Sequence, residues 1–85
     1  MNNFERVWAR IEANAGQEFR QKRGKVFTYS VYGGCVVPST TNRLLPRSDF
    51  AKAFDRQPLG GPGQIQDLQG PSYIWAILTD TRVAD

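Results

Sequence analysis

Basic side chains gather in one central stretch of the chain, and phosphate binding is the chemistry they could perform. Four of them lie within six residues: Arg20, Lys22, Arg23 and Lys25. No acidic residue occurs between Arg20 and Arg47, although the whole chain has 11 basic and 8 acidic residues and a net charge of +3. Unbalanced positive charge raises the local concentration of polyanions. The stretch therefore points to an anionic partner, with a solvated face that serves solubility as the alternative.

A polar loop over residues 39–43 continues the same basic stretch. Its side chains include Thr41, Asn42 and Arg43, and Arg47 follows shortly after. Hydroxyl, amide and guanidinium groups are the usual contacts to phosphates and base edges, and they are also ordinary loop composition. We expect Arg43 to be the candidate for reading a base. The predicted nucleic-acid-binding residues are Arg20, Lys22, Arg23, Lys25, Thr41, Asn42, Arg43 and Arg47.

Groups that would support catalysis or metal binding are sparse in the sequence. Histidine is absent, which removes the commonest general base and the commonest metal ligand. The single cysteine, Cys35, lies in an apolar strand pattern, where it is expected to face the core with no histidine to activate it. The carboxylates are scattered without a paired spacing. We therefore interpret the chain as non-enzymatic, with no metal and no cofactor.

Length and composition predict one small domain over residues 1–85. Eighty-five residues, 40% of them apolar, with five Phe, three Tyr and two Trp, suffice for one thin core. One cysteine allows no internal disulfide, so a reducing, cytoplasmic setting is the default expectation. The first residues carry charges within the apolar spacing, unlike a signal peptide, and the longest apolar run, 73–78, is too short to cross a bilayer. We expect no membrane association.

The N-terminal half predicts a helix and then a meander. Asn2 or Asn3 is the expected N-cap of an amphipathic helix over residues 3–14. Its apolar stripe at helical spacing consists of Phe4, Val7, Trp8 and Ile11. The β-meander is predicted over 17–46, from an edge strand at 17–21, a main strand at 25–32, a returning strand at 35–37 and a short third pairing at Leu44–Leu45.

The C-terminal half predicts short elements around a flexible segment. Ser48 is expected to cap a helix over 48–56. Residues 59–71 are rich in Gly and Pro and predict a long surface loop or linker, with Ile65 and Leu68 as possible anchors and no phosphate-binding glycine motif. Residues 72–82 suit a helix or a strand, and Pro and Ser at their start favour the helix.

In this order the elements predict an α+β fold. We expect a small antiparallel three-stranded meander with an N-terminal helix and one or two C-terminal helices packed on one face. The order over residues 3–56 resembles that of the double-stranded-RNA-binding domain. That family begins its last helix with lysines, whereas Ser48–Asp49 occupies the corresponding place here. The resemblance therefore extends to the order of elements and not to the basic helix start.

Two functions of different classes follow from these patterns. The first is a small, basic, non-enzymatic module that binds DNA or RNA through a cationic hairpin turn and the adjacent loop, with Tyr29 or Tyr32 stacking or packing alongside. The second is a protein-interaction or accessory module that uses the aromatic and Gly/Pro-rich C-terminal half. Tyr73 and Trp75 would then supply the aromatic anchors that dominate many interfaces.

Overall fold

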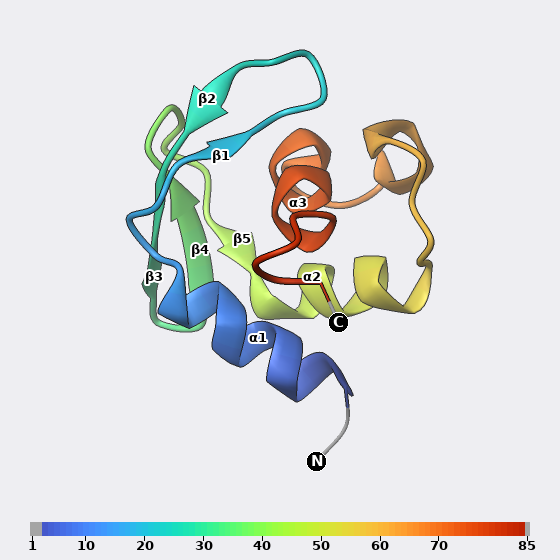
Figure 1. Ribbon diagram of the computed structural model, residues 1–85, viewed down its shortest axis with the longest axis horizontal. Coiled ribbons are helices and arrows are strands. Elements are labelled where there is room, and N and C mark those ends of the chain that lie inside the picture. The colour runs from blue at the N-terminus through green and yellow to red at the C-terminus, as the bar shows by residue number, and fades with distance from the viewer. Residues whose placement is uncertain (1–2, 85) are drawn as a thin grey trace.

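The chain forms three α-helices and two small antiparallel sheets, as a computed structural model describes for residues 3–84 (Figure 1). The sheets are a β1–β2 hairpin and a three-stranded β3–β4–β5 meander. The predicted α+β class, with an N-terminal helix beside a small antiparallel sheet, is confirmed. In chain order the elements are α1 (Asn3–Ala13), β1 (Phe19–Arg20), β2 (Val26–Phe27), β3 (Tyr29–Tyr32), β4 (Cys35–Pro38), β5 (Leu45–Pro46), α2 (Arg47–Asp55), the 3-10 helix η1 (Pro62–Ile65) and α3 (Pro71–Leu78).

The helix α1 packs its apolar stripe into the core, as its spacing predicts. All four residues of the stripe are buried. Trp8 meets Phe50 of α2 edge-on, with ring centroids 5.8 Å apart. Of the two predicted caps, Asn3 is the first helical residue and Asn2 lies outside the described residues. Burial of a 100°-wide stripe, rather than propensity alone, is what stabilises so short a helix.

The predicted main strand over 25–32 is wrong in one respect, because the structure divides it at Thr28. The backbone N–H of Thr28 donates to Ser39 Oγ over 3.0 Å, and its carbonyl accepts from the Ser39 N–H over 2.8 Å. These bonds replace a ladder partner at that point, so β2 pairs with β1 while β3 pairs with β4. The side-chain alternation continues through the break, so that Phe27 and Tyr29 both face the core.

The three-stranded meander therefore has a different membership from the predicted one. The segment at 17–21 contributes to the separate hairpin, and β5 supplies the third strand, with Leu45 opposite Val36. Cys35 is half-buried, whereas Val36 beside it is fully buried. The expectation that Cys35 faces the core is wrong, because the alternation along β4 turns Val36 inward instead.

The helix α2 begins one residue earlier than predicted. Arg47 is its first residue, and Pro46 occupies the N-cap position while still pairing in β5. The predicted cap at Ser48 is wrong, because Pro46, with φ −71°, leads directly from the strand into the helix.

Of the segment predicted at 72–82 as helix or strand, the first part is helical: α3 ends at Leu78, and residues 79–82 form turns instead of continuing the helix. Pro71 lies in the first turn, where a missing N–H costs nothing. Gly70 precedes it in the left-handed region, at φ +62°, and a Cβ there would lie 2.6 Å from Leu45 Cδ2. The helix is buried on several sides through Ile74, Ala76, Ile77 and Leu78.

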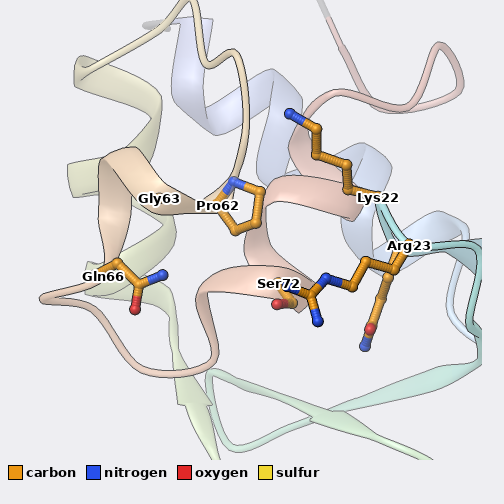
Figure 2. A pocket seen from close by; sticks show the side chains of 7 residues that line it. Lys22, Arg23, Pro62, Gly63, Gln66 and Ser72 are labelled. Atoms are coloured by element: carbon orange, nitrogen blue, oxygen red, sulfur yellow. The ribbon is translucent and has the colours of Figure 1, made fainter.

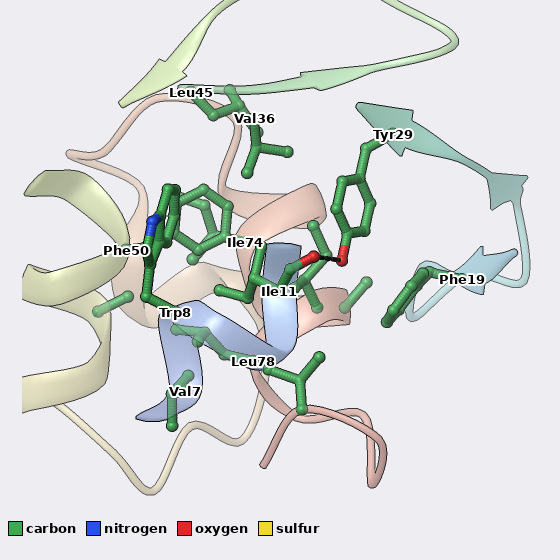
Figure 3. Packing of buried hydrophobic residues seen from close by; sticks show 14 of the residues in the cluster. Val7, Trp8, Ile11, Phe19, Tyr29, Val36, Leu45, Phe50, Ile74 and Leu78 are labelled. Carbon is green, nitrogen blue, oxygen red and sulfur yellow. Dashed lines mark hydrogen bonds between the residues drawn. The ribbon is translucent and has the colours of Figure 1, made fainter. Parts of the chain in front are cut away.

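One hydrophobic cluster joins α1, both sheets, α2 and α3 (Figure 3). Tyr29 is 3% exposed within it, and its hydroxyl donates a 2.6 Å hydrogen bond to the carbonyl oxygen of Ile11 near the end of α1. Burial raises the pKa of Tyr29 above its ordinary value. The prediction that Tyr29 could stack on a ligand is wrong, because the core covers its ring. No helix among residues 3–84 has the length and apolar character needed to span a membrane.

Candidate functional site

The tip of the β1–β2 hairpin carries half of the predicted binding residues. Gly24 provides the positive φ of the turn, at +92°, and the N–H of Gln21 donates to the carbonyl of Lys25 over 2.8 Å. The guanidinium of Arg20 bonds back to the Gly24 carbonyl over 3.1 Å. The turn thus gathers four exposed cations, Arg20, Lys22, Arg23 and Lys25.

This hairpin is docked on the C-terminal half of the chain and does not project freely. Lys22 Nζ donates a 2.8 Å hydrogen bond to the carbonyl oxygen of Gly60 and lies 5.8 Å from the centroid of the Trp75 ring. Nearer the hairpin base, Phe27 packs edge-on against Tyr73 with centroids 4.9 Å apart. The positions of the hairpin cations are therefore set by contacts on both sides of the turn.

A polar groove of about 670 Å³ lies between the hairpin tip and the segment that carries η1 and the start of α3. Figure 2 shows Lys22 and Arg23 on one side of it and Pro62 and Gln66 on the other. Its lining contains two cations, two amides and one hydroxyl, and no carboxylate. The lining residues are Gln21, Lys22, Arg23, Pro62, Gly63, Gln66 and Ser72.

The charges around the groove are unbalanced, whereas several charges elsewhere form ion pairs. Among residues 3–84, none of the six cations between Arg20 and Arg47 forms an ion pair. By contrast, Arg56 holds Asp67 with two hydrogen bonds of 2.6 and 2.8 Å. This guanidinium lowers the pKa of Asp67 to about 2. The carboxylate that follows Gln66 in the chain is thus neutralised by Arg56, and the groove keeps its positive character.

The second predicted group, Thr41, Asn42 and Arg43, lies apart from the hairpin tip. Figure 1 shows this loop beside the end of β2 that is farther from the tip. Asn42 and Arg43 are exposed, while the hydroxyl of Thr41 accepts from the Arg43 N–H over 3.2 Å. The neighbouring Thr40 hydroxyl shares a 2.7 Å hydrogen bond with Tyr73. The loop is therefore held close to the start of α3 without lining the groove.

Arg47 is not brought to the groove at all. It opens α2, and its guanidinium carbon lies 5.0 Å from the Phe4 ring centroid and 5.7 Å from that of Trp8. Such a cation–π arrangement stabilises the contact between the two helices. The structure thus separates the eight predicted residues into the hairpin tip, the polar loop and an Arg47 that packs on α1.

Sequence reasoning missed the far wall of the groove and Gln21, which lies between Arg20 and Lys22. Pro62 and Gln66 belong to the segment 59–71 interpreted as a surface loop or linker, Ser72 begins the segment interpreted as a helix or strand, and Gln21 carries no charge. Ile65 and Leu68, the possible anchors of that segment 59–71, are buried, and so is Leu59. Three apolar residues in a Gly/Pro-rich stretch are more typical of a packed loop than of a free linker.

The hydrogen-bond donors of this site suit the binding of an anion better than the binding of a metal ion or the stacking of a ligand on Tyr73 or Trp75. No group of three His, Cys, Asp or Glu side chains that could hold a metal ion occurs within residues 3–84. Tyr73 and Trp75 are half-buried against the core, and Trp75 Nε1 donates to the Leu59 carbonyl over 3.3 Å. The arrangement presents guanidinium, ammonium, amide and hydroxyl groups to one recess.

Comparisons with known proteins give no relative that would assign this site. No protein-family model matches the chain, and neither curated proteins nor solved structures give a significant match.

Proposed function

We propose that this chain is a small non-enzymatic module that binds nucleic acid through the tip of its β1–β2 hairpin. One observation carries the proposal: four exposed cations within residues 20–25 have no carboxylate partner among residues 3–84, and two of them, Lys22 and Arg23, line a groove without acidic groups. Like charges held this close repel one another unless a polyanion or its counterions neutralise them. Arg20 and Lys22 are partly satisfied by backbone carbonyls, while Arg23 and Lys25 offer their donors to a partner.

The solubility alternative accounts less well for this arrangement. Soluble surfaces commonly intersperse both signs of charge, as this chain does where Arg56 meets Asp67 and Arg82 meets Asp80. Contacts of Lys and Arg with the phosphate backbone of the nucleic acid supply most of the sequence-independent affinity. The hairpin tip is therefore proposed as a phosphate-binding surface, with Arg43 on the neighbouring loop as a secondary contact.

Fluorescence anisotropy with labelled single-stranded and duplex probes, at about 50 and 200 mM salt, tests the proposal. Three to four phosphate contacts predict a log–log salt slope near −2 to −3 on single strands and −3 to −4 on duplex DNA. Arg23→Gln and Lys25→Gln should each flatten the slope by about one unit. Lys52→Gln, an equal loss of charge on the exposed side of α2, is the matched control and should leave the slope unchanged. Absence of binding to every DNA and RNA probe at the lower salt would contradict the proposal.

A second candidate, a protein-interaction module, is favoured by the outer face of the β3–β4–β5 sheet. Tyr32 is 71% exposed and Leu44 58% exposed, and the half-buried Cys35 and Val37 share the outward side of β4. These residues, rather than Tyr73 and Trp75, would supply the contact. Sedimentation velocity at rising protein concentration tests self-association through this face, which Tyr32→Ser should abolish.

A further inference from the structure

We infer that the groove binds a single strand of nucleic acid, with a base in the recess and the adjoining phosphates on Lys22 and Arg23. This inference rests on the proposed function and names its substrate class. It draws on the groove's lining, its size and the docked state of the hairpin.

The docked hairpin is poorly placed to read a duplex. A two-stranded ribbon reads base pairs by entering the major groove, about 12 Å wide and 8.5 Å deep. Here the η1 segment flanks the tip of the ribbon, because Lys22 Nζ bonds to the Gly60 carbonyl and would lie 2.7 Å from a Cβ at position 61. Insertion of the tip into a major groove would require this segment to move away. The side chains of Gln21 and Gln66 line the groove, and the Watson–Crick edge of a base in a duplex is already occupied by its partner base.

An unpaired base, as in a single strand, does not face this obstacle. Its Watson–Crick edge is free to enter a recess and to bond with amide and hydroxyl groups that both donate and accept. Gln21, Gln66 and Ser72 are groups of this kind, and none of them carries a charge that would repel a phosphate. The Arg23 guanidinium can bond to a phosphate or stack on a base plane. The volume, about 670 Å³, falls within the range of about 300–1,000 Å³ typical of sites for small ligands. It suits one or two nucleotides rather than a turn of duplex.

Trp75 lies close enough to the groove for its fluorescence to report whether the groove is occupied. Lys22 covers the Trp75 ring at 5.8 Å, and Trp75 Nε1 is tied to Leu59 behind it. The Lys22 ammonium has donors besides the one that bonds to Gly60, and a phosphate bound to it adds negative charge near the indole. Trp8, the other tryptophan, lies in the core between α1 and α2 and is not part of the groove.

The experiment compares a fluorescein-labelled 12-nucleotide single strand with the duplex of the same sequence, at about 50 mM salt. We expect the single strand to bind at least about tenfold more tightly than the duplex. Gln66→Ala should weaken single-strand binding severalfold and leave the weak duplex binding unchanged, whereas Arg23→Gln should weaken both. Gln69→Ala, at an exposed glutamine of the same segment that lies outside the groove lining, is the matched control. A thermal melt of each variant checks that its fold is retained.

A second readout is the indole emission of the unlabelled protein. Addition of the unlabelled single strand should change it, and Trp75→Phe should remove the change. Equal or tighter binding of the duplex would overturn the inference while leaving the proposed function intact. Single-strand binding without any change in Trp75 emission would place the strand elsewhere and also overturn it. Failure of both probes to bind would overturn the inference together with the proposed function.

Discussion

Lys22 Nζ and the carbonyl oxygen of Gly60 are joined by a 2.8 Å hydrogen bond between residues 38 positions apart in the chain. This bond ties the cationic turn to the Gly/Pro-rich segment, so the groove has two fixed walls. Lys22 therefore has a structural contact as well as a charge, whereas Lys25 on the same turn is exposed and has only the charge of its side chain to contribute.

This difference predicts separate effects for two equal losses of charge. Lys22→Met should lower the free energy of unfolding by about 0.5–1.5 kcal/mol, the usual contribution of one hydrogen bond. Lys25→Met should leave it within about 0.5 kcal/mol of the parent. Both variants should lose about one unit of salt slope in binding assays. Urea unfolding of the three proteins measures the first effect, and equal stability of the two variants would show that the Gly60 contact contributes nothing.

Trp8→Ala should be severely destabilising, because Trp8 is 8% exposed and packs against Phe4 and Phe50. Emptying a large aromatic site costs about 3–5 kcal/mol, against a typical total of about 5–15 kcal/mol. We expect a partly unfolded protein or a melting temperature lowered by more than about 10 °C. Tyr32→Ala, at a residue 71% exposed, is the control and should melt close to the parent. A Trp8 variant that also melts close to the parent would contradict the observed core.

The Arg56–Asp67 pair predicts a loss of stability in acid. Hydrogen bonds from Arg56 lower the pKa of Asp67 to about 2, against an ordinary value of about 4. A depressed carboxyl pKa stabilises the folded state fully above the unfolded pKa, and this contribution disappears as the pH falls from about 4 to about 2. Asp67→Asn should therefore flatten the stability profile across that window, as measured by urea unfolding at each pH.

Asp55→Asn provides the comparison for this experiment, since Asp55 is an exposed carboxylate at the end of α2. An identical flattening in both variants would show that the Arg56 contact is not responsible.

Tyr29 predicts a loss of stability in alkali. Burial raises its pKa, so the neutral phenol is favoured in the folded state. Its contribution is complete below the unfolded pKa of about 10 and is lost as the pH rises above that value. Tyr29→Phe should reduce this dependence and should lower stability near neutral pH by about 1 kcal/mol, because the Ile11 carbonyl loses its donor. Denaturant unfolding between about pH 8 and 11 measures both effects, and a profile like that of the parent would disprove the assignment.

The elements with strong periodicity could be predicted from the sequence. The stripe of α1 and the inward alternation of Phe27 and Tyr29 are local patterns, and the structure confirms them. The division of the main strand could not be predicted, because Ser39 takes both backbone groups of Thr28 without disturbing the alternation. The start of α2 was missed because pairing of Pro46 in β5 outweighs the capping preference of Ser48.

The candidate site was predicted only in part, for a related reason. Charge along the chain locates the hairpin tip, but it does not say which segment the tip docks on. Gln66 and Ser72 join Lys22 through tertiary contacts between distant parts of the sequence, and no spacing rule encodes such contacts. Arg47 is the opposite case, a residue that the charge pattern includes but the site does not. It lies in the basic stretch of the sequence, yet its guanidinium packs on Phe4 and Trp8 of α1.

The close approach of Gly70 and Leu45 has a consequence for how this sequence can diverge. A side chain at position 70 would meet Leu45 at 2.6 Å and would also have to adopt a left-handed conformation, so two independent penalties act on one position. A smaller residue at 45 relieves the first penalty and not the second. Among descendants that keep this fold, position 70 should stay glycine while its neighbours in the loop drift, which makes it a fixed point for aligning distant sequences.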